Sequence, residues 1–255
     1  MLELIERTLD EVLPVVTERP AILSEAMRYA VGTGGKRIRP MICLLSAQAV
    51  GGSASDARYP AAAIEILHNY TLVHDDLPAM DNDTERRGKP TVWAKYGEAN
   101  AILAGDALLA LAYRVAAKAP CNASRIVKVL GEKGVGVVQG QVEDILAATG
   151  QIQATDDFIY VHKTADLFIA AAKMGGLAGG GTNEDIDKLE AFALNLGLAF
   201  QYEDDLLDND GIYPREKTEE LVRQTTDAAI SALDGLPGDT EPLKALARKL
   251  IGRTV

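Results

Sequence analysis

The apolar residues of this 255-residue chain recur at helical spacing almost from end to end. Side chains at i, i+3 and i+4 share one face of an α-helix, whereas a half-buried strand alternates apolar and polar residues. Such alternation is nearly absent, and glycine and proline cluster at a few breaks, such as residues 32–40, 51–60 and 88–90. The pattern therefore predicts an all-α fold, a large antiparallel bundle of roughly nine or ten helices.

Size and charge narrow the class of protein further. Hydrophobic residues make up 47% of the chain, which is enough for one sizeable core, so we expect a single domain over residues 1–255. The net charge of −11 argues against nucleic acid or an anionic membrane as the partner. The N-terminus lacks the features of a signal peptide, and no apolar run reads as a membrane span. We therefore expect a cytoplasmic protein.

The first of two acidic clusters ends an apolar helix and contains Asp75, Asp76 and Asp81. Asp75 and Asp81 are six residues apart, which on an ideal helix would point them to different sides. Pro78 cannot continue the helical hydrogen bonds, so the helix should end near Leu77. The turn that follows can then bring Asp81 back toward Asp75.

The second cluster ends another apolar helix and contains Asp204 and Asp208, which are one helical turn apart and so share a face. Crowded carboxylates repel one another unless cations neutralise them. Oxygen ligands without histidine or cysteine partners suit Mg²⁺. One such cluster alone would more often be a solvated helix end, but two at the ends of apolar helices favour a site for Mg²⁺ and diphosphate.

Basic residues in three places could bind diphosphate together with these carboxylates. The groups are Gly35, Lys36 and Arg39 at the start of a predicted helix, Arg86 and Arg87 just after the first cluster, and Lys163 with Thr164 in a later helix. Helix N-termini and guanidinium groups both suit phosphate oxygens. Any one group alone would most often be solvated surface charge. Together with the acidic clusters they imply two diphosphate sites, one bridged through metal and one bound directly by cations.

The segment EILHNYTLVHDDLPAMDNDTERRGKPT, residues 65–91, resembles the first aspartate-rich region of the trans-isoprenyl diphosphate synthases almost position by position. The segments GGKRIRP, YGEANAILAGD, HKTADLF and FQYEDDLLD resemble other blocks of that family, in the same order. The resemblance covers roughly residues 30–210, and motifs of this length are specific. It implies the helix bundle of the isoprenoid synthases, a prenyltransferase activity that depends on three Mg²⁺ ions, and a homodimer.

The resemblance also implies a role for each matching residue. The residues expected to hold metal are Asp75, Asp76, Asp81, Asp204 and Asp208. Those expected to bind isopentenyl diphosphate are Gly35, Lys36, Arg39, His68 and Arg87. Those expected to face the allylic diphosphate and its developing positive charge are Arg86, Lys163, Thr164 and Gln201. Asp75, Asp76, Asp81, Lys163 and Asp204 are accordingly the expected catalytic residues.

Product length depends on how soon the hydrophobic tunnel below the first cluster is closed. Tyr70 lies five residues before Asp75, a little over one helical turn deeper, with Thr71 beside it. A bulky ring there should close the tunnel early, and an aromatic at this place resembles the bacterial farnesyl diphosphate synthases. We therefore expect the fifteen-carbon farnesyl diphosphate, with geranylgeranyl diphosphate as the alternative.

The chain departs from the family pattern after Asp208. The family continues there with a lysine- and glycine-rich loop, whereas residues 209–215 run almost straight into the next helix, and Lys217 is a weak counterpart of the loop lysine. Two other functions therefore compete. A terpene cyclase would not need the GGKRIRP segment or a second DDxxD motif. A non-catalytic subunit of a heteromeric synthase would typically have lost the aspartate motifs that this chain keeps.

Overall fold

The computed structural model describes residues 1–17, 19–153, 157–208 and 211–251, and almost all of them lie in helices or in short connections between helices. The helices are α1 (Leu2–Val12), α2 (Ala21–Gly32), α3 (Ile38–Ala49), α4 (Arg58–Asp75), α5 (Val92–Tyr96), α6 (Glu98–Ala116), α7 (Ala123–Ala148), the π-helix η1 (Tyr160–Ala165), α8 (Asp166–Ala178), α9 (Asn183–Asp208), α10 (Arg215–Ala232) and α11 (Glu241–Ile251). The strands β1 (Glu85–Arg86) and β2 (Lys89–Pro90) form one short antiparallel hairpin. The all-α prediction is confirmed.

With η1 counted, the described residues contain two or three helices more than the sequence pattern indicated. One reason is α5, whose five residues are too short to show a helical period. The other is η1, which runs directly into α8 without a glycine or proline between them. The single-domain organisation stays a prediction.

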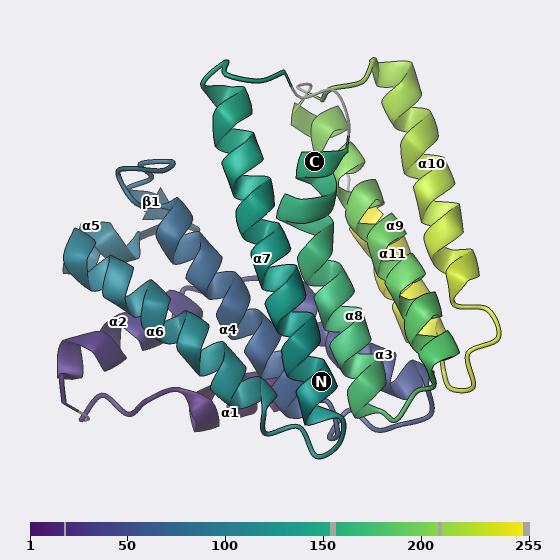
Figure 1. The fold of residues 1–255 in the computed structure, drawn as a ribbon, viewed down its shortest axis with the longest axis horizontal. Coiled ribbons are helices and arrows are strands. Elements are labelled where there is room, and N and C mark those ends of the chain that lie inside the picture. The colour runs from purple at the N-terminus through teal and green to yellow at the C-terminus, as the bar shows by residue number, and fades with distance from the viewer. Residues whose placement is uncertain (18, 154–156, 209–210, 252–255) are drawn as a thin grey trace.

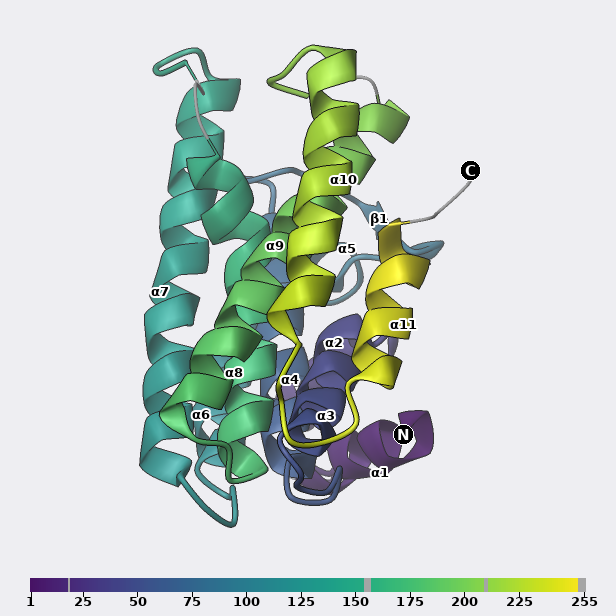
Figure 2. The same ribbon diagram turned by 90° about the vertical axis from the view of Figure 1, so that its right-hand side faces the viewer.

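The long helices stand side by side, with α7, α8, α9 and α10 following one another across the bundle in Figure 1. Helix α10 packs along α9, and α11 packs against α3 and α9, as Figure 2 shows from the side. Helix α4 lies within the bundle and contacts α3, α6 and α8. Both α4 and α9 end in the upper half of Figure 1, so the two acidic helix ends point to the same end of the molecule.

Helix α4 is apolar on nearly every side because neighbouring helices surround it, and the side chains from Ala61 to Leu67 are all buried. The helix ends as Pro78 predicts: its last residue is Asp75, and the amide of Leu77 already donates to the nearer carbonyl of His74 at 3.2 Å. The helix therefore delivers a carboxylate from a buried, rigid element, which fixes its position better than a loop would.

Helix α6 corrects one expectation of the sequence analysis. Over its 19 residues an 18-residue window has a mean hydropathy of 1.3, so by length and composition this helix could cross a membrane. In the structure α6 packs against α4, and 44% of that window is buried inside the protein.

Candidate active site

The turn after α4 brings the first acidic cluster together. The amide of Asp81 donates to the carbonyl of Asp75 at 2.9 Å, and the amide of Asn82 donates to the carbonyl of Leu77 at 3.1 Å. Asn82 takes the left-handed backbone conformation (φ 56°) that this reversal requires. The predicted return of Asp81 toward Asp75 is confirmed.

The ionised form of Asp75 is less favourable than that of an ordinary aspartate. Burial raises the pKa of Asp75 to about 6, the nearby ammonium of Lys163 opposes that shift, and the charge of Asp81 adds to it. A carboxylate in this position gains from any cation that enters the site.

Asp76 is 3% exposed and pairs with Arg86. Its Oδ1 accepts from Arg86 Nε at 2.7 Å and from Arg86 Nη2 at 2.6 Å, and Asp83 lies 3.4 Å from the same guanidinium. Burial raises the pKa of Asp76, and the bond from Arg86 opposes that shift. In this state Asp76 and Arg86 satisfy each other, so the predicted metal role of Asp76 and the predicted phosphate role of Arg86 would both require the pair to rearrange.

A cavity of about 500 Å³ opens below Asp75. Its walls come from α3, α4, α7, η1, α8 and the turn after α4. Most of the lining surface is apolar, and Asp75, Lys163 and Thr164 are among its polar groups. Tyr70 and Thr71 line it from α4, as the sequence predicted for residues that set product length. The edge of the Tyr70 ring packs on His74, with 5.2 Å between the ring centroids.

Lys163 and Thr164 reach this cavity from the π-helix η1. A π-helical turn carries an extra residue and is frequent at functional sites. Lys163 Nζ lies 2.5 Å from Asp144 Oδ2 on α7, which holds the ammonium at the cavity wall. Thr164 Oγ1 donates to Gln201 Oε1 at 3.0 Å, so Gln201 on α9 joins the site through Thr164.

The aspartates of the second acidic cluster differ in burial and in what they contact. Asp205 is buried and accepts from Tyr160 Oη at 2.7 Å and from Gln201 Nε2 at 3.2 Å, so it fixes the end of α9 against η1. Asp204 is half-buried and Asp208 is exposed, and neither lines the cavity below Asp75. The structure therefore brings Gln201 into the site but leaves the two expected metal ligands of α9 beside it.

The segment after α9 was expected to lack the family's lysine-rich loop. Residues 209 and 210 lie outside the described residues. Lys217 lies in the first turn of α10 and contacts Glu220 at 3.1 Å on the exposed surface, which does not resemble a loop lysine above a diphosphate.

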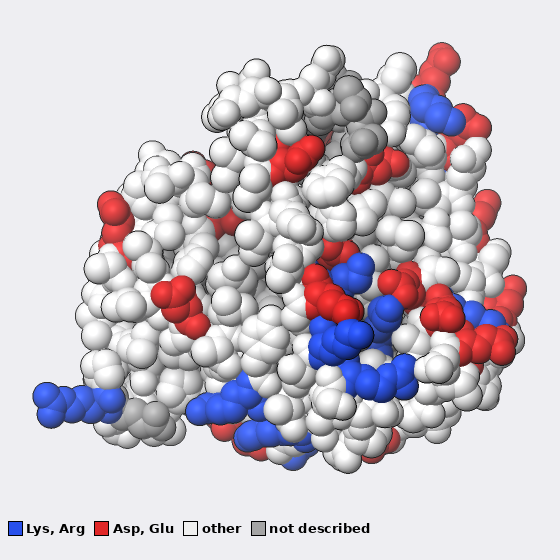
Figure 3. All heavy atoms as spheres, in the orientation of Figure 1, with Lys and Arg blue, Asp and Glu red and all other residues white. Residues whose placement is uncertain are grey.

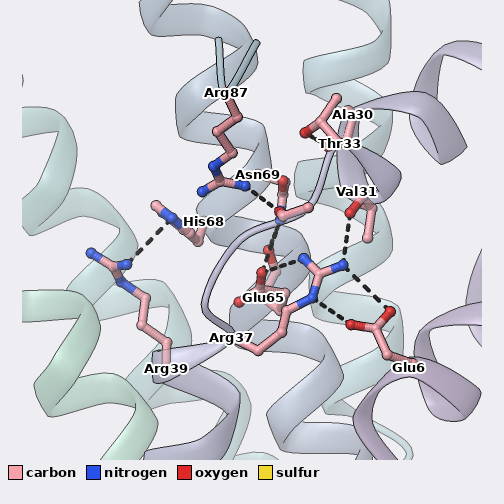
Figure 4. Close-up of polar contacts among 11 residues, drawn as sticks. Glu6, Ala30, Val31, Thr33, Arg37, Arg39, Glu65, His68, Asn69 and Arg87 are labelled. Carbon is pink, nitrogen blue, oxygen red and sulfur yellow. Dashed lines mark hydrogen bonds and ion pairs between the residues drawn. The ribbon is translucent and has the colours of Figure 1, made fainter. Parts of the chain in front are cut away.

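A second cavity, of about 470 Å³, is lined mostly by polar and charged residues, four of which are arginine or lysine. The predicted isopentenyl diphosphate residues Gly35, Lys36, Arg39, His68 and Arg87 all line it. Figure 4 shows Arg87 above the loop that precedes α3, where its Nη1 donates to the carbonyl of Gly34. Gly35 has a φ of +128°, and a Cβ there would lie 2.7 Å from Arg87 Nη1, so only glycine allows this approach.

Arg37 takes no part in the anion-binding group although it stands between Lys36 and Arg39 in the sequence. Its Nη1 bonds to Glu65 Oε1 at 2.7 Å, its Nε to Glu6 Oε1 at 2.7 Å, and its Nη2 to the carbonyl of Val31 at 2.9 Å (Figure 4). Arg37 and Glu65 are both buried. Arg37 also lines the cavity, but its guanidinium is engaged by these partners and anchors the loop to α1 and α4.

Arg39 and His68 form the wall between the two cavities, because both residues line both of them. Arg39 Nη1 lies 3.3 Å from His68 Nε2, and the Arg39 guanidinium lies over the ring of Phe168. Burial, with the charges of Arg39 and Arg87, lowers the pKa of His68 well below its usual range, so the imidazole is neutral and accepts from Arg39. Arg39 Nε and His68 Nδ1 are buried donors without a partner among the described residues.

Sequence reasoning missed three residues that the structure places in or behind the site: Gln141, Asp144 and Glu65. Gln141 and Asp144 stand among valines on α7, and a polar residue in such a run is the only sequence signal they give. Glu65 is an acid inside the most apolar part of α4, which indicates a buried charge that needs a partner.

The carboxylates of the first acidic cluster could supply part of the coordination shell of a Mg²⁺ ion. Among the residues that the structure describes, no three acidic, histidine or cysteine side chains converge closely enough to hold a metal ion alone. Mg²⁺ commonly takes only one or two carboxylates and completes its shell with water and substrate phosphate. Asp75 and Asp81 fit such a half-site, since they supply hard oxygen atoms whose mutual repulsion a cation would relieve.

Comparisons with known proteins identify the family. The sequence pattern of the family described as polyprenyl synthetase matches residues 20–221. The chain is 46% identical over 214 residues to the chloroplastic geranylgeranyl pyrophosphate synthase of Capsicum annuum, covering 80% of this chain and 57% of that protein. It is 42% identical over 219 residues to the chloroplastic heterodimeric geranylgeranyl pyrophosphate synthase large subunit 1 of Arabidopsis thaliana, covering 81% and 58%. The chain belongs to the polyprenyl synthetase family.

The fold agrees with solved members. A FPP/GFPP synthase from Zymomonas mobilis superposes with a TM-score of 0.89 at 32% identity, covering 98% of this chain and 97% of that one. A geranylgeranyl pyrophosphate synthetase from Pyrococcus horikoshii gives a TM-score of 0.87 at 30% identity, covering 99% and 96%. The chain nevertheless spans less than three fifths of the length of the two curated plant relatives.

The raised pKa of Asp75 predicts a pH-dependent stability. An unfolded aspartate releases its proton near pH 4, whereas folded Asp75 keeps its proton up to about pH 6. Between these values the folded state binds more protons, so the free energy of unfolding contributed by Asp75 falls as the pH rises. Asp75→Asn should therefore raise the melting temperature of the metal-free chain at pH 8 by about 2–4 °C, and should change it little at pH 4.

Thermal unfolding in EDTA at both pH values measures this effect. Asp227→Asn, a change at an exposed position of α10, is the matched control and should leave the melting temperature unchanged. A melting temperature of the Asp75→Asn chain at pH 8 that equals or falls below that of the wild type contradicts the prediction.

Proposed function

We propose that this chain is a short-chain trans-prenyl diphosphate synthase that joins isopentenyl diphosphate to an allylic diphosphate. The observation that carries the proposal is the wall shared by the two cavities. One cavity is a cationic pocket suited to a diphosphate, the other has a largely apolar surface and contains Asp75 and Lys163, and Arg39 and His68 line both. Two diphosphate substrates bound in this way would present their reacting carbons to one another.

The chain's own residues support each step of this reaction. Lys36, Arg39 and Arg87 hold the isopentenyl diphosphate by direct ion pairs, and Lys163 holds the allylic diphosphate from the opposite wall. The allylic C–O bond breaks and its electron pair leaves with the diphosphate. The isopentenyl double bond then attacks the allylic carbon, and the proton lost from the new chain passes to the departed diphosphate. The apolar side chains of α7 keep water from the allylic cation.

The carboxylates complete the proposal. Asp75 and Asp81 would hold Mg²⁺ on the allylic diphosphate, with Asp204 and Asp208 as ligands from α9 once substrate bridges the gap, and Asp76 once Arg86 turns to phosphate. Bound Mg²⁺ would supply charge neutralisation of the diphosphate leaving group. A total of three ions remains the expectation from the resemblance. The oxygen atoms of Thr164 and Gln201 suit the allylic cation, whereas the ammonium of Lys163 suits the diphosphate.

For the product we propose a twenty-carbon chain, geranylgeranyl diphosphate, in place of the fifteen-carbon product expected from Tyr70. The relatives of 42–46% identity named above are geranylgeranyl synthases. The ring of Tyr70 lines the cavity below Asp75, and apolar residues of α7 continue along the same cavity.

Incubation of the purified chain alone with Mg²⁺, dimethylallyl diphosphate and isopentenyl diphosphate tests the function. Mass spectrometry should detect prenyl diphosphates, with the twenty-carbon product in excess. Cyclic hydrocarbons would support a terpene cyclase instead. No product from the chain alone, with product restored by a second synthase subunit, would support a regulatory subunit and contradict the proposal.

Tyr70 should limit product length because its ring lines the cavity. In the Tyr70→Ala chain we expect a product distribution longer by at least one five-carbon unit, since truncation opens space below Asp75. Tyr70→Phe keeps the ring and is the matched control, so its products should equal those of the wild type. An unchanged distribution in the Tyr70→Ala chain would remove Tyr70 as the floor of the cavity.

We also propose that two copies of the chain pair through α6 and α7. Figure 3 shows a largely uncharged surface over the upper part of α7 and beside it, while charged side chains gather over the lower part of α7. The outer faces of both helices carry large apolar side chains that are each at least 36% exposed: Ile102, Leu103, Val135, Val138, Val142 and Ile145. Val138, Val142 and Ile145 also line the apolar cavity. A second copy on this surface would bury the apolar side chains and close the cavity against water.

Leu103→Arg should convert this dimer into a monomer, because it places a charge at the centre of an apolar contact without touching the cavity lining. Sedimentation velocity of the chain alone measures the state. Leu2→Arg, at a similarly exposed leucine on α1, is the control and should remain dimeric. A wild-type chain that sediments as a monomer at micromolar concentration would contradict the homodimer and favour a heteromeric partner.

A further inference from the structure

One polar side chain in the apolar cavity has no role in the structure described so far. Gln141 lies on α7, is 8% exposed, and lines the cavity that also holds Asp75 and Lys163. Its Nε2 is buried and has no hydrogen-bond partner among the described residues. Buried amide donors without a hydrogen-bond partner are rare in folded proteins, because leaving such a donor unpaired is unfavourable.

The surroundings of Gln141 show that packing alone does not explain it. The other side chains that α7 presents to the cavity are aliphatic: Val137, Val138, Val142 and Ile145. An aliphatic residue at position 141 would continue this wall and would bury no unpaired donor. The amide therefore fits a partner that is absent from the protein itself.

The neighbours of Gln141 on α7 indicate what that partner is. Asp144, one turn further along α7, lies 2.5 Å from the ammonium of Lys163. Gly140 lets α7 approach the same turn of η1, since a Cβ there would lie 2.4 Å from the backbone nitrogen of Lys163. Gln141 therefore belongs to the part of α7 that meets Lys163, at the charged end of the cavity.

We propose that Gln141 is a further substrate-contacting residue of the allylic site, and that its Nε2 donates a hydrogen bond to an oxygen of the allylic diphosphate. This inference rests on the proposed function. As the allylic C–O bond breaks, its electron pair moves onto the diphosphate, and a fixed donor beside that oxygen binds the departing anion more strongly than the intact ester. The donor keeps its own proton throughout. Because the amide is neutral, it adds no further positive charge next to the allylic carbocation.

The test compares Gln141→Leu and Gln141→Glu with the wild type. Leucine removes the donor with little change of volume, so kcat should fall about 100-fold. The dissociation constant for an unreactive allylic thiolodiphosphate with Mg²⁺ should rise about tenfold. The melting temperature should stay level or rise, because an unpaired buried donor has been removed. Gln139→Leu, at an exposed glutamine of the same helix, is the matched control and should behave as the wild type.

Glutamate at position 141 separates a donor from an acceptor role. A carboxylate would repel the diphosphate, so the Gln141→Glu chain should bind the thiolodiphosphate more weakly than the Gln141→Leu chain. Wild-type affinity in either variant would overturn the inference, and so would a loss of affinity matched by a lower melting temperature in the Gln141→Leu chain. The binding measurement needs no turnover, so a wild-type chain without product would count against the proposed function alone.

Discussion

The buried ion pair between Arg37 and Glu65 determines how the rest of the site can be arranged. The two side chains are each 4% exposed and lie 2.7 Å apart, and Arg37 takes a left-handed backbone conformation (φ 50°) to reach its partner. Removing one member of such a pair leaves a buried charge and costs about 3–5 kcal/mol. The pair ties the loop before α3 to α4, and Glu6 ties α1 to the same guanidinium. Helix α1 precedes the matched region of residues 20–221, yet it helps to hold the anion-binding loop in place.

Because that loop is fixed on α4, one helix presents groups to both cavities. Glu65 and His68 belong to the cationic cavity, while Tyr70, Thr71 and Asp75 belong to the apolar one, and His68 takes part in both. Successive turns of a rigid helix are 5.4 Å apart, so α4 sets the separation between anion site, shared wall and acidic mouth. A reaction that joins two diphosphates needs this kind of fixed separation, since a displacement of about 1 Å can cost about 100-fold in rate.

Sequence reasoning predicted the parts of the site that depend on local rules. The end of α4 before Pro78, the return of Asp81 and the position of Tyr70 all follow from backbone geometry over fewer than ten residues. The sequence analysis left Arg37 out of the anion site, but the physical reason could not be read from the sequence, because it lies in the distant partners Glu6 and Glu65. The π-helix at Lys163 was missed for a similar reason, since its extra residue is stabilised by packing against α7 through Gly140.

The second aspartate cluster shows why a motif does not translate directly into a set of ligands. Three aspartates stand within five residues, yet Asp205 is turned inward to Tyr160 and Gln201, and it thereby fixes the end of α9 and the position of Thr164. A helix gives neighbouring residues different directions, so the inward aspartate and its outward neighbours Asp204 and Asp208 cannot all serve the same ion. Asp205 therefore anchors the end of α9, and Asp204 and Asp208 stay the candidate metal ligands of this helix. The placement of this helix end therefore depends on a hydrogen-bonded network in which the Asp205 carboxylate joins Tyr160 to Gln201, and Gln201 in turn accepts from Thr164.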